Sequence, residues 1–83
     1  MGELIRKFTQ LNGKIATIIL EHKLFGKQQF EAKEVNVLDD DDRLGLILHG
    51  QGVYVYKQRL QSMEIRDHFV EFADDKLKIL IKF

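Results

Sequence analysis

The segment at residues 44–57, LGLILHGQGVYVYK, constrains the fold of this chain more than any other. It consists of an apolar run, a His-Gly-Gln-Gly sequence, and a second run in which apolar and aromatic residues alternate. Two such runs separated by a few residues that include glycine are typical of a β-hairpin. We therefore expect two antiparallel strands here, joined by a tight turn in which Gly50 or Gly52 supplies the positive φ.

The chain on the N-terminal side of this hairpin predicts one short helix and further strands. Residues 3–11, ELIRKFTQL, have apolar side chains at helical spacing, and the following Asn-Gly is a stop signal. Residues 13–22 predict a strand with apolar side chains on both faces, which suggests a barrel or a covered sheet. In residues 28–38 the alternation shifts phase near Lys33 and Glu34, which suggests a bulge or a strong bend.

The last third of the chain predicts more β-structure. We expect a strand at residues 62–66 and then a hairpin whose turn is Asp74-Asp75. In the final strand the apolar residues share one face and the lysines the other, with Leu80 as the exception. Proline is absent, so exposed strand edges must be protected by charge or by pairing with another chain.

Residues 39–42 are four consecutive aspartates. Like charges in a run repel one another, so we expect a solvated loop whose side chains pack against nothing. A site for a divalent cation is the alternative, but the run lacks the spaced oxygen ligands and the glycine of a calcium loop.

Composition excludes several classes of protein. The 83 residues suffice for a single domain with a modest core. Thirteen Lys and Arg balance thirteen Asp and Glu, so no global positive field attracts nucleic acid or an anionic membrane. The chain has no cysteine, no apolar core of a signal peptide at its start, and no run of membrane-spanning length. We expect a cytoplasmic protein that does not insert into membranes.

The sequence shows no pattern for catalysis or for a cofactor. His22, His49 and His68 are far apart and lack the spacing of zinc ligands. No serine or threonine stands in a nucleophile motif. We therefore expect no enzymatic activity and predict no catalytic residue, cofactor or metal.

Two short motifs resemble those of the Sm-like (Lsm- and Hfq-like) family of small ring-forming β-barrel proteins. The first family motif ends in Asp-x-x-Met-Asn; here AKEVN, residues 32–36, matches it with Val35-Asn36 and has Ala32 in place of the Asp. The second is Arg-Gly between two apolar strands, which LGLILHGQGVYVY matches with His49 in place of Arg. A competing register at VYKQ, residues 55–58, would move the second motif seven to eight residues along the chain.

The resemblance covers residues 3–57 and implies a fold and a function. The fold would be a short helix followed by a strongly bent five-stranded barrel, with residues 58–83 as an extra strand and hairpin. Edge-strand pairing would assemble copies of the chain into a homo-oligomeric ring. The ring would bind single-stranded, U- or A-rich RNA: Asn36 would read a base edge, His49 would stack or add charge, Gly50 would let the backbone approach, and Lys57 would neutralise a phosphate.

A second function remains open beside RNA binding. The chain is alternatively a protein-interaction or assembly module on a small β-barrel, with residues 58–83 covering one face or docking a partner. In that case Asn36 is a solvent-facing strand position and His49 a turn residue. Tyr54 and Tyr56, which share one face of a strand, form either a stacking platform or one wall of a core.

Overall fold

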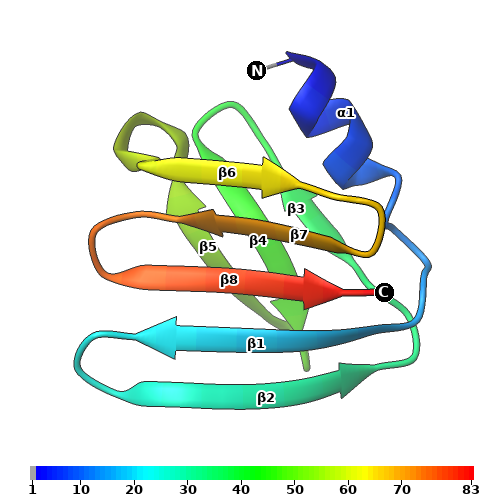
Figure 1. Ribbon diagram of the computed structural model, residues 1–83, viewed down its shortest axis with the longest axis horizontal. Helices are drawn as coiled ribbons and strands as arrows, with labels where there is room; N and C mark the ends of the chain where they lie inside the picture. The colour runs from blue at the N-terminus through cyan, green and yellow to red at the C-terminus, as the bar shows by residue number, and fades with distance from the viewer. Residues whose placement is uncertain (1) are drawn as a thin grey trace.

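The computed structural model describes the backbone of residues 2–83 and the side chains of residues 6–83. Within these residues, one short helix is followed by eight strands in two sheets (Figure 1). The elements are α1 (Gly2–Thr9), β1 (Ala16–His22), β2 (Gly26–Ala32), β3 (Val37–Asp39), β4 (Arg43–Leu48), β5 (Gln51–Tyr56), the 3-10 helix η1 (Lys57–Arg59), β6 (Ser62–Ile65), β7 (Phe69–Ala73) and β8 (Leu77–Lys82). The predicted mostly β class with a short N-terminal helix is confirmed.

The two sheets form two layers. The larger sheet has the strand order β2-β1-β8-β7-β6 and the smaller has the order β3-β4-β5, with every neighbouring pair antiparallel. Figure 1 shows the strands of the smaller sheet crossing behind those of the larger one. Neither sheet closes on itself, so β2, β6, β3 and β5 are all edge strands. Among the described residues, neither α1 nor η1 is long and apolar enough to cross a membrane.

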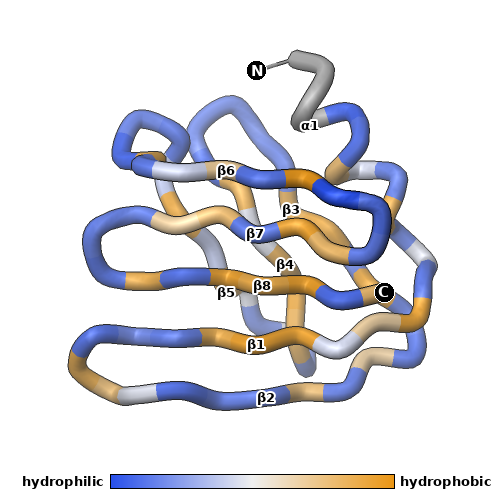
Figure 2. The backbone as a smooth tube through the Cα atoms, viewed as in Figure 1, coloured by the Kyte–Doolittle hydropathy of each residue, from blue (hydrophilic) through white to orange (hydrophobic). Residues whose placement is uncertain are grey.

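The core lies between the two sheets, where side chains from alternate strand positions meet. Figure 2 shows the most apolar stretches in the central strands β1 and β8 of the larger sheet. Helix α1 contributes Phe8, whose ring meets that of Phe72 edge to face with 5.3 Å between centroids. The fully buried large side chains are Phe8, Ile18, Val35, Leu44, Leu46, Val55, Val70, Phe72, Ile79 and Ile81.

Strand β1 is buried on one face and only partly buried on the other, where Ile19 is buried but Glu21 is exposed, so the predicted burial on both faces is confirmed only in part. Ile18 faces the core, and Ile19 on the opposite face is only 9% exposed. Because β1 pairs with β2 on one side and with β8 on the other, it is an interior strand of the larger sheet. Ile15, which the alternation places on the face of Ile19, precedes the strand and is exposed.

The phase shift near Lys33 and Glu34 is a strong bend, as predicted. After β2 the chain leaves the larger sheet, passes through residues 33–36, and enters the smaller sheet as β3. The backbone N–H of Val35 donates to the carbonyl oxygen of Lys14 at 2.8 Å, and that of Gly13 donates to the Val35 carbonyl at 2.7 Å. The segment after α1 therefore holds the bend in place.

The predicted β4–β5 hairpin is confirmed. Leu48 pairs with Gln51, so the turn consists of His49 and Gly50 alone. Their φ angles are 51° and 80°, and two consecutive positive φ angles are characteristic of a type I′ turn. Gly50 supplies a positive φ as predicted, Gly52 does not, and His49 supplies the other. Asn and Gly are the residues most often found in such turns, which is why the sequence alone did not indicate His49.

The C-terminal third is part of the central fold. The strand expected at residues 62–66 is β6, and the hairpin with its turn at Asp74-Asp75 joins β7 to β8. Together β6, β7 and β8 supply three of the five strands of the larger sheet, and β8 pairs with β1. Residues 58–83 therefore add strands beside β1 in the larger sheet. They do not cover Asn36 or His49, which are both exposed.

The acidic run differs from its prediction. Asp41 and Asp42 are exposed, but Asp39 and Asp40 have partners, so the expectation that the run packs against nothing is wrong. Asp39 ends β3, and Asp40 turns the chain by accepting the backbone N–H groups of Asp42 and Arg43 at 3.0 and 2.7 Å. The cations that pair with these carboxylates come from Arg43 and, far along the sequence, from Lys57.

Candidate functional site

The Sm-like resemblance implies four RNA-binding residues, and the structure places three of them at one end of the smaller sheet. Asn36, His49 and Gly50 are all exposed. The backbone N–H of Ile47 donates to the carbonyl oxygen of Asn36 at 2.9 Å, so Asn36 lies beside a residue only two positions before His49. His49 also approaches β2, since its ring centroid lies 6.3 Å from that of Phe30.

Lys57 lies at the other end of the β4–β5 hairpin. Strand β5 separates it from the turn by six residues, or about 20 Å at the rise of a strand. Its ammonium group is 2.7 Å from the carboxylate of Asp39 and donates to the carbonyl oxygen of Asp40 at 2.6 Å. The structure therefore does not bring Lys57 together with Asn36 and His49.

The outer face of the smaller sheet carries a second group of side chains that suit nucleic-acid binding. Strand register puts Asn36 in a row with Ile47, Leu38 in a row with Tyr54, and Arg43 opposite Tyr56. Ile47 and Tyr56 are 40% and 44% exposed. We call this surface the aromatic face; it consists of Asn36, Leu38, Arg43, Ile47, Tyr54 and Tyr56.

The two tyrosines pack against each other and against Arg43. Their ring centroids are 5.6 Å apart with the planes nearly perpendicular, and the Arg43 guanidinium lies 5.0 Å from the centroid of the Tyr54 ring. A hydrogen bond with Tyr54 holds the pKa of Tyr56 above its ordinary value. A cation beside two aromatic rings is an arrangement that attracts both the bases and the phosphates of a single strand.

Arg43 is positioned by Asp40. The Nε of Arg43 donates to the Asp40 carboxylate at 2.7 Å. This hydrogen bond is the main reason that the pKa of Asp40 is lowered and that of Arg43 is raised. Both side chains are partly exposed, so solvent weakens the pair, and its main role is to orient the guanidinium beside Tyr54.

Two glycines keep the centre of the aromatic face free of other side chains. At Gly45, a Cβ atom would lie 2.0 Å from the carbonyl oxygen of Val53 and 2.5 Å from the Cα of Tyr54, so only glycine allows this close approach of β4 and β5. Gly52 has only van der Waals neighbours, including the Tyr54 ring at 3.6 Å. Glycine therefore stands both opposite Tyr54 and two residues before it in β5.

Sequence reasoning found this face only in part. The same-face placement of Tyr54 and Tyr56 followed from their spacing, and the structure places them on the outer face and not in a wall of the core. Arg43 was missed, because its position opposite Tyr56 depends on the two-residue length of the turn.

Comparison of the chain with known protein families, with curated proteins and with solved structures finds no match.

Proposed function

We propose that this protein binds single-stranded RNA on the aromatic face. The observation that carries the proposal is the pair of partly exposed tyrosine rings beside the Arg43 guanidinium. Stacking of bases on aromatic rings contributes about 1–3 kcal/mol per base and tolerates any sequence. Asn36, on the same face, offers an amide that pairs with the edge of a base, and U- or A-rich strands are the expected ligands.

We also propose that the chain belongs to the Sm-like family. The order of helix, strands and bend supports this assignment, as does the exposure of Asn36, His49 and Gly50 at one end of the smaller sheet. Assembly into a homo-oligomeric ring is part of the same proposal. It is supported by the unpaired edge strands, because an exposed edge offers its backbone N–H and C=O groups to a strand of another copy.

A second candidate function is a protein-interaction module that does not bind nucleic acid. One observation favours it: Leu24 and Phe25, in the turn between β1 and β2, are 82% and 78% exposed. The β2 edge follows this turn directly, and most of its residues are exposed. A partner strand that pairs with β2 would cover both the edge and the apolar turn.

Intrinsic tyrosine fluorescence gives a direct test of RNA binding. The chain has two tyrosines and no tryptophan, so its emission comes from the aromatic face alone. Titration with U-rich and A-rich oligonucleotides, corrected for absorption by the bases, should quench this emission to saturation. The apparent affinity should fall as the salt concentration rises, because phosphate contacts release counterions. Emission that does not change with either oligonucleotide would leave the interaction module as the better account.

Substitutions separate stacking from general attraction. Replacing both tyrosines with leucine should weaken binding of a labelled oligonucleotide at least about tenfold, while Tyr54→Phe with Tyr56→Phe should retain most of it. Phe25→Leu, which alters an exposed aromatic residue outside the aromatic face, is the matched control. Equal affinity of the leucine and phenylalanine variants would rule out stacking on this face.

A further inference from the structure

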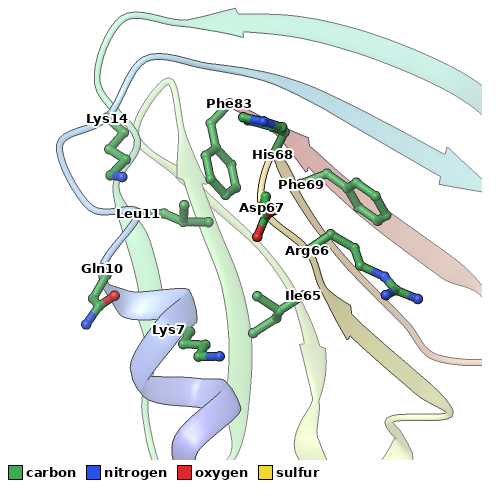
Figure 3. Close-up of a pocket in the computed structure, with 10 residues that line it drawn as sticks. All are labelled: Lys7, Gln10, Leu11, Lys14, Ile65, Arg66, Asp67, His68, Phe69 and Phe83. Carbon is green, nitrogen blue, oxygen red and sulfur yellow. The ribbon is translucent and has the colours of Figure 1, made fainter.

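A pocket lined by described residues lies away from the aromatic face, beside α1. Its volume is about 730 Å³, within the range of about 300–1,000 Å³ that is usual for small-molecule sites. It is formed by α1 and the segment after it, by the turn between β6 and β7, and by Phe83 (Figure 3). The lining residues are Lys7, Gln10, Leu11, Lys14, Ile65, Arg66, Asp67, His68, Phe69 and Phe83.

Charge is divided between the two sides of this pocket. Figure 3 shows Lys7 and Lys14 on the side of α1, with the Asp67 carboxylate on the opposite side. Arg66 points away from the pocket in the same view, and its Nε lies 2.6 Å from the carboxylate of Glu64. The pocket therefore has two ammonium groups on one side and one carboxylate on the other.

Apolar side chains lie between these charged groups. Leu11 belongs to the buried core, and Ile65 and Phe83 are partly buried. The Phe83 backbone N–H donates to the carbonyl oxygen of His68 at 2.9 Å, which ties this residue to the β6–β7 turn. The Lys14 ammonium lies 5.5 Å from the centroid of the Phe83 ring, so the ring has a cation on one side.

We propose that this pocket binds a nucleoside monophosphate. Its phosphate carries nearly two negative charges at neutral pH, and the ammonium groups of Lys7 and Lys14, which line the α1 side of the pocket, attract it. The planar base fits the partly exposed apolar side chains of Ile65 and Phe83, and the Asp67 carboxylate accepts a hydrogen bond from a ribose hydroxyl. The pocket shares no residue with the aromatic face, so this proposal does not depend on RNA binding to that face.

Isothermal titration calorimetry with AMP, adenosine and inorganic phosphate tests the proposal on the full chain. AMP should bind at least about tenfold more tightly than adenosine or phosphate, because only AMP uses both the lysines and the apolar surface. Phosphate that binds as tightly as AMP would show a simple anion site and would overturn the proposal. Adenosine that binds as tightly as AMP would exclude a role for the lysines and would also overturn it.

A matched pair of double variants locates the site. Lys7→Gln with Lys14→Gln should weaken AMP binding at least about tenfold. Lys27→Gln with Lys78→Gln removes the same charge from exposed positions of β2 and β8 and should leave binding unchanged. All four lysines are exposed, so both variants should fold. Equal weakening in the two variants would mean non-specific attraction and would contradict the proposed site.

Tyrosine emission separates this site from the proposed RNA-binding face. AMP bound beside α1 should leave the emission of Tyr54 and Tyr56 unchanged, because neither tyrosine lines the pocket. Quenching by AMP that persists in the Lys7→Gln, Lys14→Gln variant would place the nucleotide on the aromatic face and would overturn the proposal for the pocket.

Discussion

The Lys57 ammonium group lies 2.7 Å from the Asp39 carboxylate, and it joins the segment after β5 to the end of β3 across the smaller sheet. The same ammonium donates to the carbonyl oxygen of Asp40. Both side chains of the ion pair are less than one quarter exposed, so water screens it less than a surface pair. The contact ties the β3–β4 turn to the chain that follows β5.

Because of these contacts, we expect Lys57 to contribute to stability. Lys57→Met keeps most of the side-chain stem but leaves Asp39 and the Asp40 carbonyl without their donor. It should lower the free energy of unfolding by about 1–3 kcal/mol in urea titrations. Lys82→Met, at an exposed position of β8, should change it little. A Lys57 variant of unchanged stability that binds RNA more weakly would instead support the phosphate contact implied by the Sm-like resemblance.

The left-handed turn predicts different effects at two nearby glycines. Gly50 has a φ of 80°, so Gly50→Ala forces a side chain into a conformation that costs about 1–2 kcal/mol. Gly52 has no positive φ, and a Cβ there would meet only ordinary van der Waals neighbours. Thermal or urea unfolding should therefore show a clear loss for Gly50→Ala and almost none for Gly52→Ala. Similar losses in both variants would contradict the turn geometry.

We expect the free energy of unfolding to depend on pH through Asp40. Arg43 lowers the pKa of Asp40 in the folded state, so the stabilisation is present above the ordinary aspartate pKa of about 3.9. It is lost as the pH falls through the lowered pKa of the folded state. Asp40→Asn should therefore be less stable than the unaltered chain near neutral pH, and the difference should shrink in acid.

Urea unfolding at a series of pH values checks this expectation. Asp41→Asn is the control, since Asp41 lies in the same turn and is exposed. A stability difference for Asp40→Asn that stays constant from neutral to acidic pH would show that the Arg43 contact is not electrostatic in origin.

Because β6, β7 and β8 are three of the five strands of the larger sheet, we expect that residues 1–57 do not fold alone. Their removal takes away β6, β7 and β8 together with four fully buried side chains, and it exposes Ile18 of β1 to water. Loss of apolar burial on this scale exceeds the stability of a small domain. The lost core residues are Val70, Phe72, Ile79 and Ile81.

Circular dichroism and a two-dimensional NMR spectrum of the 1–57 fragment give the measurement. We expect the signals of an unfolded or aggregated chain, and recovery of folded signals when a peptide of residues 58–83 is added. A fragment that folds by itself would show that residues 58–83 are an extension, as the Sm-like resemblance implies.

Local features of this protein could be predicted from the sequence. The alternation of apolar residues and the position of Gly50 predicted the β4–β5 hairpin, and Asp74-Asp75 predicted the turn between β7 and β8. The phase shift near Lys33 predicted the bend between β2 and β3. These features depend on backbone geometry over a few residues, which side-chain periodicity and turn residues report directly.

Strand partners and contacts between distant residues were decided by the tertiary structure. β1 pairs with β8 from the other end of the chain, and Lys57 pairs with an aspartate from a run that the sequence predicted to be solvated. Arg43 lies beside Tyr54 only because a two-residue turn sets the register of β4 and β5. Alternation indicates which face of a strand is buried. The choice of partner strand depends on how all the apolar faces are buried together, which no local pattern specifies.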